Sequence, residues 1–413
     1  MIKIKKLEIE NFKSLKNATV DAFGDVNLFY GFNNSGKSNV FKFLELLFKP
    51  KELRETVDVK NEAPSGREST NIETLISYTP YYDGNIYDQP FLFFKNERKN
   101  SIKFIITLLV SNEILPEKEK LKSGGYLGED VSEIVLEGTV TSTSISESYL
   151  QIQSGKINGK LFYQILDGIA YYFEKGATVG RKESDIILGL FSDLVTYIDT
   201  DRNFITEILL EGNSNFDSKN FKNWLFDLNI DSDKFEIFNQ LINFISNFKF
   251  SDDAKNKLSG NLSSFPFSEN TQISFAKFGQ EIEVMLNNSD GRFPLKNYGT
   301  GVQQLFFILT NIFSSKAKVI IIEEMELNLS QIYQLEILKF LKSLMGQKFD
   351  QLLLSSHSPF FTTHGADLLD YIHYVAINSH GLEGTTVESH DDPKSLVDND
   401  NPADNSFFSL LFS

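Results

Sequence analysis

Runs of apolar residues along the chain predict an α/β fold. Residues Val26–Tyr30, Val319–Ile322 and 352–354 are short and mostly apolar, as is typical of strands buried on both faces of a parallel sheet. Residues 39–48 and 305–313 carry apolar side chains at helical spacing. Polar or glycine-rich turns adjoin these runs, and in α/β sheets ligands bind outside the carboxyl ends of the strands. We therefore expect the chemistry of this chain at those turns.

The remaining pattern predicts a β-rich lobe followed by a helical segment. Residues 1–31 predict three short strands with turns at Lys16-Asn17 and Phe23-Gly24-Asp25. Residues 50–90 are polar and predict a surface insertion. Further strands are expected at residues 101–110, 133–143, 150–153, 160–166 and 279–287.

From about residue 183 to residue 250 the apolar residues recur at helical spacing, as in the set Phe238, Leu241, Ile242 and Ile245. This stretch has no sustained heptad repeat. We therefore expect a compact helical insertion and not a coiled coil.

Residues 31–38 match the phosphate-binding P-loop pattern G-x-x-x-x-G-K-[ST] between a predicted strand and a predicted helix. Glycines at both ends let the backbone aim its N–H groups at phosphate oxygens, and the helix start adds the positive end of its dipole. Lys37 is expected to reach the β- and γ-phosphates, and Ser38 to hold Mg²⁺. The predicted nucleotide-binding residues here are Gly31, Asn33, Asn34, Ser35, Gly36, Lys37, Ser38 and Asn39.

Two further strands end in residues suited to phosphoryl chemistry. Glu323 and Glu324 follow the first, where Glu323 is expected to orient the Mg²⁺ shell and Glu324 to polarise the attacking water. His357 follows the second and is expected to sense the γ-phosphate or to position that water. A strand that ends in surface acids, and a hydrogen-bonded turn histidine, are the alternative interpretations.

A glycine-rich turn, Tyr298-Gly299-Thr300-Gly301-Val302-Gln303-Gln304, comes directly before the predicted helix 305–313. A helix start with free N–H groups is an anion-binding site, so Thr300, Gly301 and Gln303 are further candidates for nucleotide contact. The alternative is an ordinary glycine-rich helix cap.

In this order, the four segments resemble the ABC-type ATPases of the SMC/RecF/OLD group. Residues 4–14 are similar to that group's first strand, which ends in I-x-N-F-[KR]-S. Residues 298–304, 323–328 and 356–359 resemble its G-[ST]-G-x-Q-Q, E-E-P-E-x-H and T-H-S-P segments. The resemblance covers about residues 1–110 and 270–380.

The resemblance implies an ABC-type P-loop ATPase head with ATP and Mg²⁺ as cofactors. In such ATPases the glycine-rich signature of one subunit completes the P-loop site of another, so we expect at least a dimer. The expected domains are the first part of the head with a β-rich lobe (1–170), the helical insertion (171–270), the second part of the head (271–385) and an acidic tail with an apolar end (386–413).

The chain also departs from the family pattern. Glu323 stands where most ABC proteins have Asp, Met325 replaces the proline, and Asn328 replaces the histidine of E-E-P-E-x-H. Gln89 is a weak candidate for the Q-loop glutamine. Residues 194–202 resemble the family's Y-I-x-x-x-R stretch, so Arg202 faces either nucleotide or DNA, or is a solvated surface arginine.

Composition narrows the class of protein. The formal net charge is −16, which opposes strong nonspecific DNA binding over the whole surface but not a local basic patch. Eight lysines cluster near the start of the chain, and we interpret them as solvated side chains beside the P-loop. They are Lys3, Lys5, Lys6, Lys13, Lys16, Lys42, Lys49 and Lys51.

The sequence has no cysteine, no signal-peptide pattern and no apolar run long enough to span a membrane. We therefore expect a cytoplasmic protein without membrane contact.

Three functions remain to be weighed. OLD nucleases carry a Toprim nuclease domain of about a hundred residues after the histidine loop. We expect an OLD-like ATPase that lacks this domain, because Asp398-Asn399-Asp400 matches its D-x-D pair only by chance, with no strand before it. The favoured hypothesis is an ATPase subunit that controls a separate effector protein such as a nuclease. Stand-alone OLD-like ATPases that resemble this chain occur in anti-phage systems. The apolar segment 406–413 is suited to docking on a partner. The alternative is a RecF/SMC-like DNA-binding clamp in repair, with nucleic acid as partner. A transporter ATPase fits these motifs poorly.

Overall fold

The computed structural model describes residues 1–31, 35–48, 100–111, 132–142, 148–166, 169–174, 194–200, 202, 221–248, 251, 272–278, 281–288, 291–358, 372–379 and 385–390, together with short strands at 52–53, 59–60, 70–71, 76–78, 177–178 and 207–208. The expected surface insertion (except for those four strands within 52–78), Gln89, Asp398, Asp400 and the tail 391–413 lie outside the described residues.

A six-stranded sheet forms the centre of the molecule, in the order β14-β19-β20-β3-β21-β22. Neighbouring strands are parallel except for the last pair, β21 and β22. The bounds are β3 (Val26–Tyr30), β14 (Val195–Ile198), β19 (Val319–Ile322), β20 (Gln351–Ser356), β21 (Ile372–Ser379) and β22 (Thr385–His390). The α/β fold and the three apolar strands expected from the sequence are therefore confirmed.

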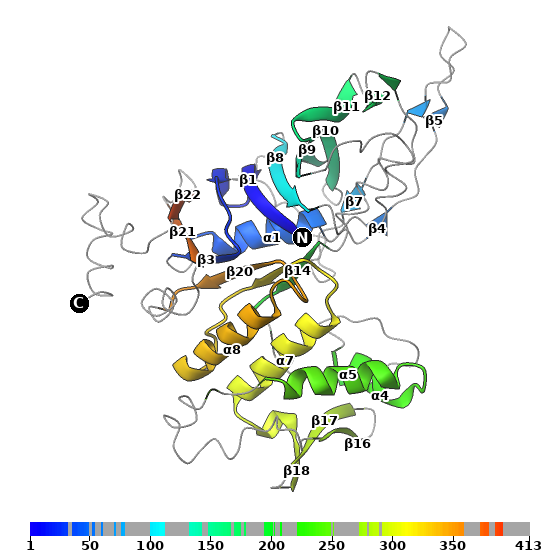
Figure 1. Cartoon of the computed structure of the whole chain (residues 1–413), viewed down its shortest axis with the longest axis vertical. Coiled ribbons are helices and arrows are strands. Elements are labelled where there is room, and N and C mark those ends of the chain that lie inside the picture. The colour runs from blue at the N-terminus through cyan, green and yellow to red at the C-terminus, as the bar shows by residue number, and fades with distance from the viewer. Residues whose placement is uncertain are drawn as a thin grey trace, which may run out of the picture.

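Both faces of this sheet are covered, which explains why β19 is apolar throughout and why β3 and the middle of β20 are mostly apolar. Along β19, Val319 and Ile321 belong to one core cluster, whereas Ile320 and Ile322 belong to another. The first cluster includes α1 (Lys37–Phe48), and the second includes α7 (Thr300–Ser314) and α8 (Gln331–Leu344). Figure 1 shows α7 and α8 on the side of the sheet opposite to β1 and β8.

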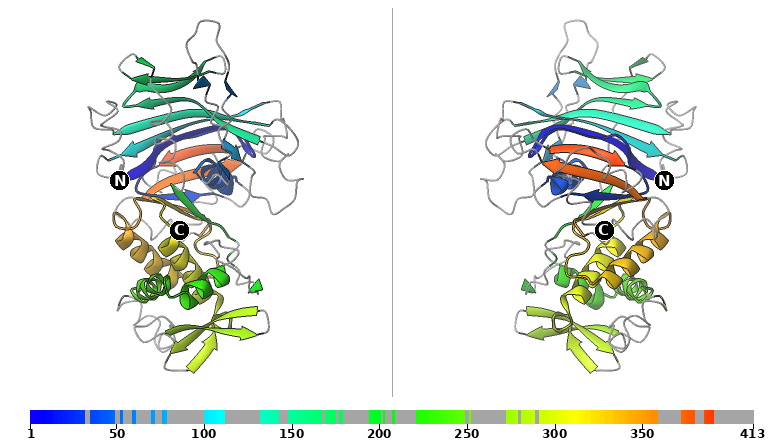
Figure 2. Two further views of the ribbon diagram at one scale, coloured as in Figure 1. Left: turned by 90° about the vertical axis from the view of Figure 1, so that its right-hand side faces the viewer. Right: turned by 90° about the vertical axis from the view of Figure 1, so that its left-hand side faces the viewer.

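The β-rich lobe is a second, antiparallel sheet of ten strands with the main path β13-β12-β11-β10-β9-β8-β1-β2. Figure 2 shows this sheet at one end of the molecule. Its strands are β1 (Ile2–Phe12), β2 (Leu15–Val20), β4 (Glu52–Leu53), β7 (Ile76–Tyr78), β8 (Ile102–Val110), β9 (Glu133–Ser142), β10 (Ser148–Ile157), β11 (Lys160–Leu166), β12 (Ile169–Glu174) and β13 (Ala177–Thr178). The strands β5 (Val59–Lys60) and β6 (Thr70–Asn71) form a separate pair.

The first turn of the chain differs from the prediction. Phe12 pairs with Leu15, so the β1–β2 turn consists of Lys13 and Ser14, and Lys16-Asn17 lies inside β2. Lys13 has a φ of 49°, the left-handed conformation that such a two-residue turn requires. The sequence signal was misleading because Asn17 favours turns in general.

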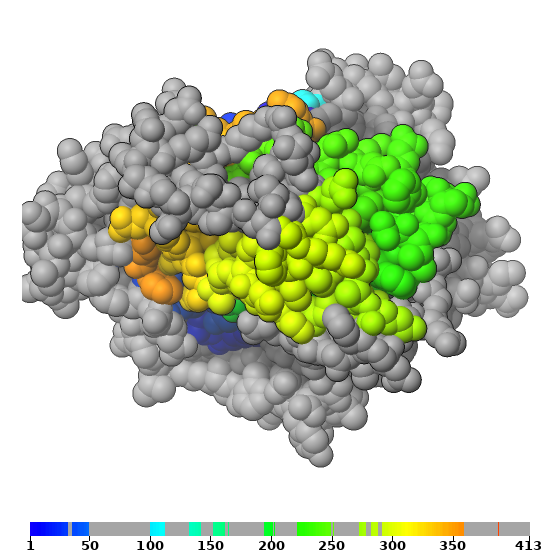
Figure 3. All heavy atoms as spheres, turned by 90° about the horizontal axis from the view of Figure 1, so that it is seen from below, coloured from blue at the N-terminus to red at the C-terminus, as the bar shows by residue number. Residues whose placement is uncertain are grey.

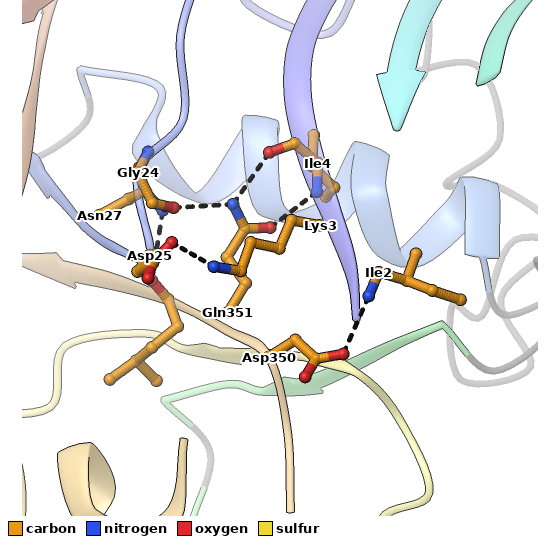
Figure 4. A network of polar contacts seen from close by, with 9 residues as sticks. Ile2, Lys3, Ile4, Gly24, Asp25, Asn27, Asp350 and Gln351 are labelled. Atoms are coloured by element: carbon orange, nitrogen blue, oxygen red, sulfur yellow. Dashed lines mark hydrogen bonds and ion pairs between the residues drawn. The ribbon is translucent and has the colours of Figure 1, made fainter. Parts of the chain in front are cut away.

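A buried polar network joins the two sheets (Figure 4). The amide of Gln351, at the start of β20, accepts a hydrogen bond from the Ile4 N–H at 2.9 Å and donates to the Ile4 and Gly24 carbonyls at 2.9 and 2.8 Å. The neighbouring Asp350 accepts from the Ile2 N–H at 2.9 Å. These bonds attach β1 to the strand that leads to His357.

Two helices and a small sheet cover the far side of α7. The helices α4 (Phe221–Ile230) and α5 (Phe235–Ser246) pack in the same core cluster as α7, and Figure 3 shows their green spheres beside the yellow ones of α7 and its neighbours. The small sheet contains β15 (Glu207–Ile208), β16 (Gln272–Phe278), β17 (Glu281–Asn288) and β18 (Gly291–Pro294), and the 3-10 turn η5 (Leu295–Asn297) leads from it to α7. In the set predicted for α5, Phe238, Leu241 and Ile245 are buried.

The expectation of helix from residue 183 to residue 250 is wrong at Val195–Ile198. This segment is β14, a parallel neighbour of β19 in the central sheet. Its β-branched residues favour a strand, and the partner strand that selects this conformation lies more than a hundred residues later in the chain. The predicted limits of the domains stay a prediction, and β14 places part of the range 171–270 in the central sheet. No helix among the described residues has the length and apolar character to cross a bilayer.

Candidate functional site

The P-loop segment joins β3 to α1, as expected. Gly36 has a φ of 106°, a backbone conformation that residues with a Cβ atom rarely adopt, and the helix begins at the next residue. Lys37 is buried, and its Nζ donates to the Gly31 carbonyl at 2.7 Å. Ser35 is also buried, whereas Asn33 and Asn34 lie outside the described residues. Asn39 donates to the Ser14 hydroxyl at 2.8 Å, so it ties α1 to the β1–β2 turn.

Burial lowers the pKa of Lys37, and the nearby carboxylates of Glu324, Glu326 and Glu323 oppose this shift. Lys37 is thus a desolvated cation whose ammonium group donates a hydrogen bond to a backbone carbonyl. Such a group gains strongly from an added anion, because a charge interacts more strongly in a site with little water. This environment suits a phosphate-binding lysine.

Ser38 and Glu323 meet directly. The Ser38 hydroxyl donates to Glu323 Oε1, and the Tyr197 hydroxyl donates to Glu323 Oε2. Glu323 is buried at the end of β19. One hydroxyl and one carboxylate side by side suit Mg²⁺, which is usually bound through one or two carboxylates together with phosphate oxygens and water. The residue types and their contact therefore fit the expected metal.

Glu324, Glu326 and His357 form a second group beside the P-loop lysine. The His357 Nδ1 lies 3.8 Å from Glu324 Oε1 and 3.7 Å from Glu326 Oε1. The Glu326 Oε1 also accepts the His357 backbone N–H at 2.9 Å. The other oxygen of Glu326 is buried without a hydrogen-bond partner among the described residues. Glu324 and His357 are therefore brought together as the sequence predicted.

Glu326 was not predicted as a site residue, although it lies within the quoted E-E-P-E-x-H resemblance. Tyr30 lies at the end of β3. Burial, together with the charge of Glu326, raises the pKa of Tyr30 to about 12. Tyr197 was missed in the same way, inside the Y-I-x-x-x-R stretch. Burial, followed by the charge of Glu323, raises the pKa of Tyr197 well above its ordinary value.

Arg202 is buried, so the alternative of a solvated surface arginine is wrong, while a role toward nucleotide or DNA stays a prediction. It is 1% exposed, its Nη2 donates to the Glu323 carbonyl, and its Nε donates to the Asp199 carbonyl at 2.7 Å. Burial lowers its pKa to about 10. Backbone carbonyls accept hydrogen bonds from Nε and Nη2, whereas Nη1 is buried without a hydrogen-bond partner among the described residues. Residue type alone does not indicate such an arrangement.

The glycine-rich turn starts α7, which begins at Thr300, five residues earlier than the predicted helix. Thr300 is exposed, and a Cβ atom on Gly301 would lie 2.9 Å from the Asn328 carbonyl oxygen. Gln303 donates to the carbonyls of Tyr298 and Lys296 at 2.9 and 3.2 Å. The amide of Gln303 thus stabilises its own turn, while Thr300 faces outward.

Several lysines of the predicted basic cluster have acidic neighbours. Lys3 pairs with Asp25, Lys5 with Glu133 at 2.8 Å, and Lys6 with Glu8 and Asp21 at 2.9 and 3.0 Å. Exposed pairs of this kind contribute little stability, but they reduce the positive potential of the surface. Lys49 and Lys51 lie outside the described residues.

Comparisons with known proteins agree with an ATPase. A family model described as AAA ATPase domain matches residues 2–362. No curated protein matches the chain.

Similar solved structures include three SMC head domains. A head bound to the C-winged helix domain of ScpA has 16% identity and a TM-score of 0.49, covering 95% of this chain and 99% of that chain. The head from Thermotoga maritima has 13% identity and a TM-score of 0.42, with 94% and 99% covered. A head with an extended coiled coil, bound to the C-terminal domain of ScpA derived from Pyrococcus furiosus, has 11% identity and a TM-score of 0.45, with 100% of both chains covered.

Proposed function

The chain belongs to the AAA ATPase domain family, and on this premise we propose that it is a Mg²⁺-dependent ATPase whose ATP sites form between two copies of the chain. One observation carries the catalytic part of this proposal. Lys37 and Ser38 of the P-loop lie with Glu323 and Glu324, which come from a different strand nearly three hundred residues later.

Each of these side chains has a role that follows from its position. Lys37 binds the phosphates, and Glu324 accepts a hydrogen bond from the attacking water and polarises it. His357, next to Glu324, orients that water or the γ-phosphate. Ser38 and Glu323 would hold Mg²⁺, which neutralises charge on the phosphate oxygens.

The proposal of a two-chain site rests on the start of α7. Its N–H groups and the exposed Thr300 hydroxyl are donors that suit a phosphate oxygen. The turn packs against Asn328, so its position relative to the chain's own acidic strand is set by a backbone contact. The resemblance to ABC-type ATPases supports the idea that a second copy brings its bound nucleotide to this turn.

We further propose that the ATPase controls a separate effector protein, in anti-phage defence. The resemblance to stand-alone OLD-like ATPases supports this part. The acidic neighbours of Lys3, Lys5 and Lys6, together with the net charge of −16, argue against the alternative of a DNA-binding clamp.

The Glu324→Gln variant tests both parts. It should bind ATP, hydrolyse it at least a hundredfold more slowly than the wild type, and retain its partners when purified from its native cells with ATP and Mg²⁺. The double variant Lys37→Ala/Glu324→Gln is the matched control, because it should not bind the nucleotide. An effector protein in stoichiometric amount, absent from the control, supports the proposal; nucleic acid alone would favour the clamp. A wild-type rate of hydrolysis would contradict the assignment of Glu324.

A further inference from the structure

The peptide group between Glu323 and Glu324 is held at both of its polar atoms. The Glu323 carbonyl accepts a hydrogen bond from Arg202 Nη2. The Glu324 N–H donates to the Ser355 hydroxyl at 2.9 Å. Neither Arg202 nor Ser355 was among the residues expected to act in hydrolysis.

The orientation of this peptide group decides where the Glu324 side chain points. Rotation of a peptide plane changes ψ of the residue before it and φ of the residue after it. Glu324 has a φ of 45°, in the left-handed region that is unfavourable for a residue with a Cβ. Without an external constraint, the chain would gain by turning this plane and moving the carboxylate.

The donor, Arg202, and the acceptor, Ser355, that supply this constraint are themselves buried and held in place. Arg202 is 1% exposed and follows β14, and its Nε is bound to the Asp199 carbonyl at 2.7 Å. Ser355 is 0% exposed and lies on β20. Because β14 and β20 are the two neighbours of β19, the peptide is held from both sides of its own strand.

Arg202 also contacts the helix that starts with the glycine-rich turn. The Gln304 side-chain amide on α7 donates to the Arg202 carbonyl at 3.4 Å. Arg202 therefore connects the end of the acidic strand to α7.

We propose that Arg202 and Ser355 are positioning residues, which hold the Glu323–Glu324 peptide so that the Glu324 carboxylate faces the P-loop lysine and His357. This inference rests on the proposed function, because it assigns to both residues an action through Glu324. A misplacement of a catalytic group by about 1 Å can reduce the rate by about a hundredfold, so the effect on turnover should be large.

The test compares substitutions in two backgrounds. Ser355→Ala and Arg202→Lys should each lower kcat by about 10- to 100-fold, with the KM for ATP changed less than about threefold, because the P-loop is left intact. Ser355→Thr keeps the hydroxyl and should recover most of the rate. In the Glu324→Gln background, measured in single turnovers, Ser355→Ala should cause no further loss, since its only route of action has been removed.

Thr310→Val provides the matched control. Thr310 is as buried as Ser355, and its hydroxyl has no hydrogen-bond partner among the described residues. Its kcat should stay within about twofold of the wild type.

Two results would overturn the inference while leaving the proposed function intact. One is a wild-type kcat for Ser355→Ala when Glu324→Gln is inactive. The other is an equal loss from Ser355→Ala in both backgrounds, which would indicate a general structural role. If Glu324→Gln itself turned over ATP normally, the proposed role of Glu324 would fail first, and the inference with it.

Discussion

Replacing Gly301 with alanine should destabilise the side of the molecule that contains α7. The added Cβ would lie 2.9 Å from the Asn328 carbonyl oxygen and 3.6 Å from Leu329 Cδ2. The closer neighbour is a backbone atom, which cannot move aside as the end of a side chain could. Either α7 or the loop after Glu324 must therefore shift.

Two opposing effects set the magnitude. Alanine is favoured over glycine inside a helix by up to about 1 kcal/mol. Overpacking in a close contact costs about 1–3 kcal/mol, and a rigid backbone neighbour places this contact toward the upper part of that range. We therefore expect a net loss of about 1–2 kcal/mol in the free energy of unfolding.

Urea unfolding followed by tryptophan fluorescence is the suitable assay. Trp224 is the single tryptophan of the chain, and it belongs to the same buried cluster as Leu305 and Phe306 of α7. Gly299→Ala is the control, because a Cβ at Gly299 would have no neighbour within 4 Å; its cost as a helix cap should stay below about 1 kcal/mol. A Gly301→Ala variant as stable as the wild type would refute the close contact between α7 and Asn328.

Three other substitutions test separate parts of the structure. Gln351→Leu removes the buried amide that binds Ile4 and Gly24, and the unsatisfied backbone groups should lower stability by about 2–4 kcal/mol in a urea titration. Glu283→Gln removes the buried charge that pairs with Lys296 at 2.7 Å and lies 3.9 Å from the buried Lys222, so thermal unfolding should report a loss of about 3 kcal/mol. An unchanged midpoint would exclude both pairs as stabilising contacts. Burial raises the pKa of Tyr30 to about 12, so the folded state keeps a proton that the unfolded state loses near pH 10. The free energy of unfolding should therefore fall by about 2 kcal/mol as the pH rises from 10 to 12. Tyr30→Phe should reduce this dependence on pH, and an identical dependence in both proteins would contradict the raised pKa of Tyr30.

Local signals in the sequence were sufficient for the strands and turns that carry the site. The strands β3, β19 and β20 are apolar because both of their faces are buried, and this property is visible without knowledge of the fold. The P-loop, the paired Glu323 and Glu324, and His357 directly follow these strands. Their meeting at one edge then follows from the parallel arrangement of the sheet.

The contacts of Arg202, Ser355 and Tyr197 could not be predicted in the same way. They depend on which strands become neighbours of β19, and β14 was hidden inside a pattern interpreted as helical. The ion pairs of Lys3 with Asp25 and of Lys5 with Glu133 likewise join residues that are far apart along the chain. Such partners are selected by tertiary structure, which local periodicity does not encode.

A complementation experiment tests the two-chain ATP site most directly. Lys37→Ala removes the P-loop cation, and Thr300→Arg blocks the exposed start of α7, so each variant alone should be inactive. When the two are mixed in equal amounts, half of the dimers contain both variants, and each mixed dimer has one intact site out of two. The account predicts recovery of about a quarter of the wild-type ATPase rate. A mixture that forms mixed dimers but hydrolyses ATP no faster than the two separate variants would contradict it.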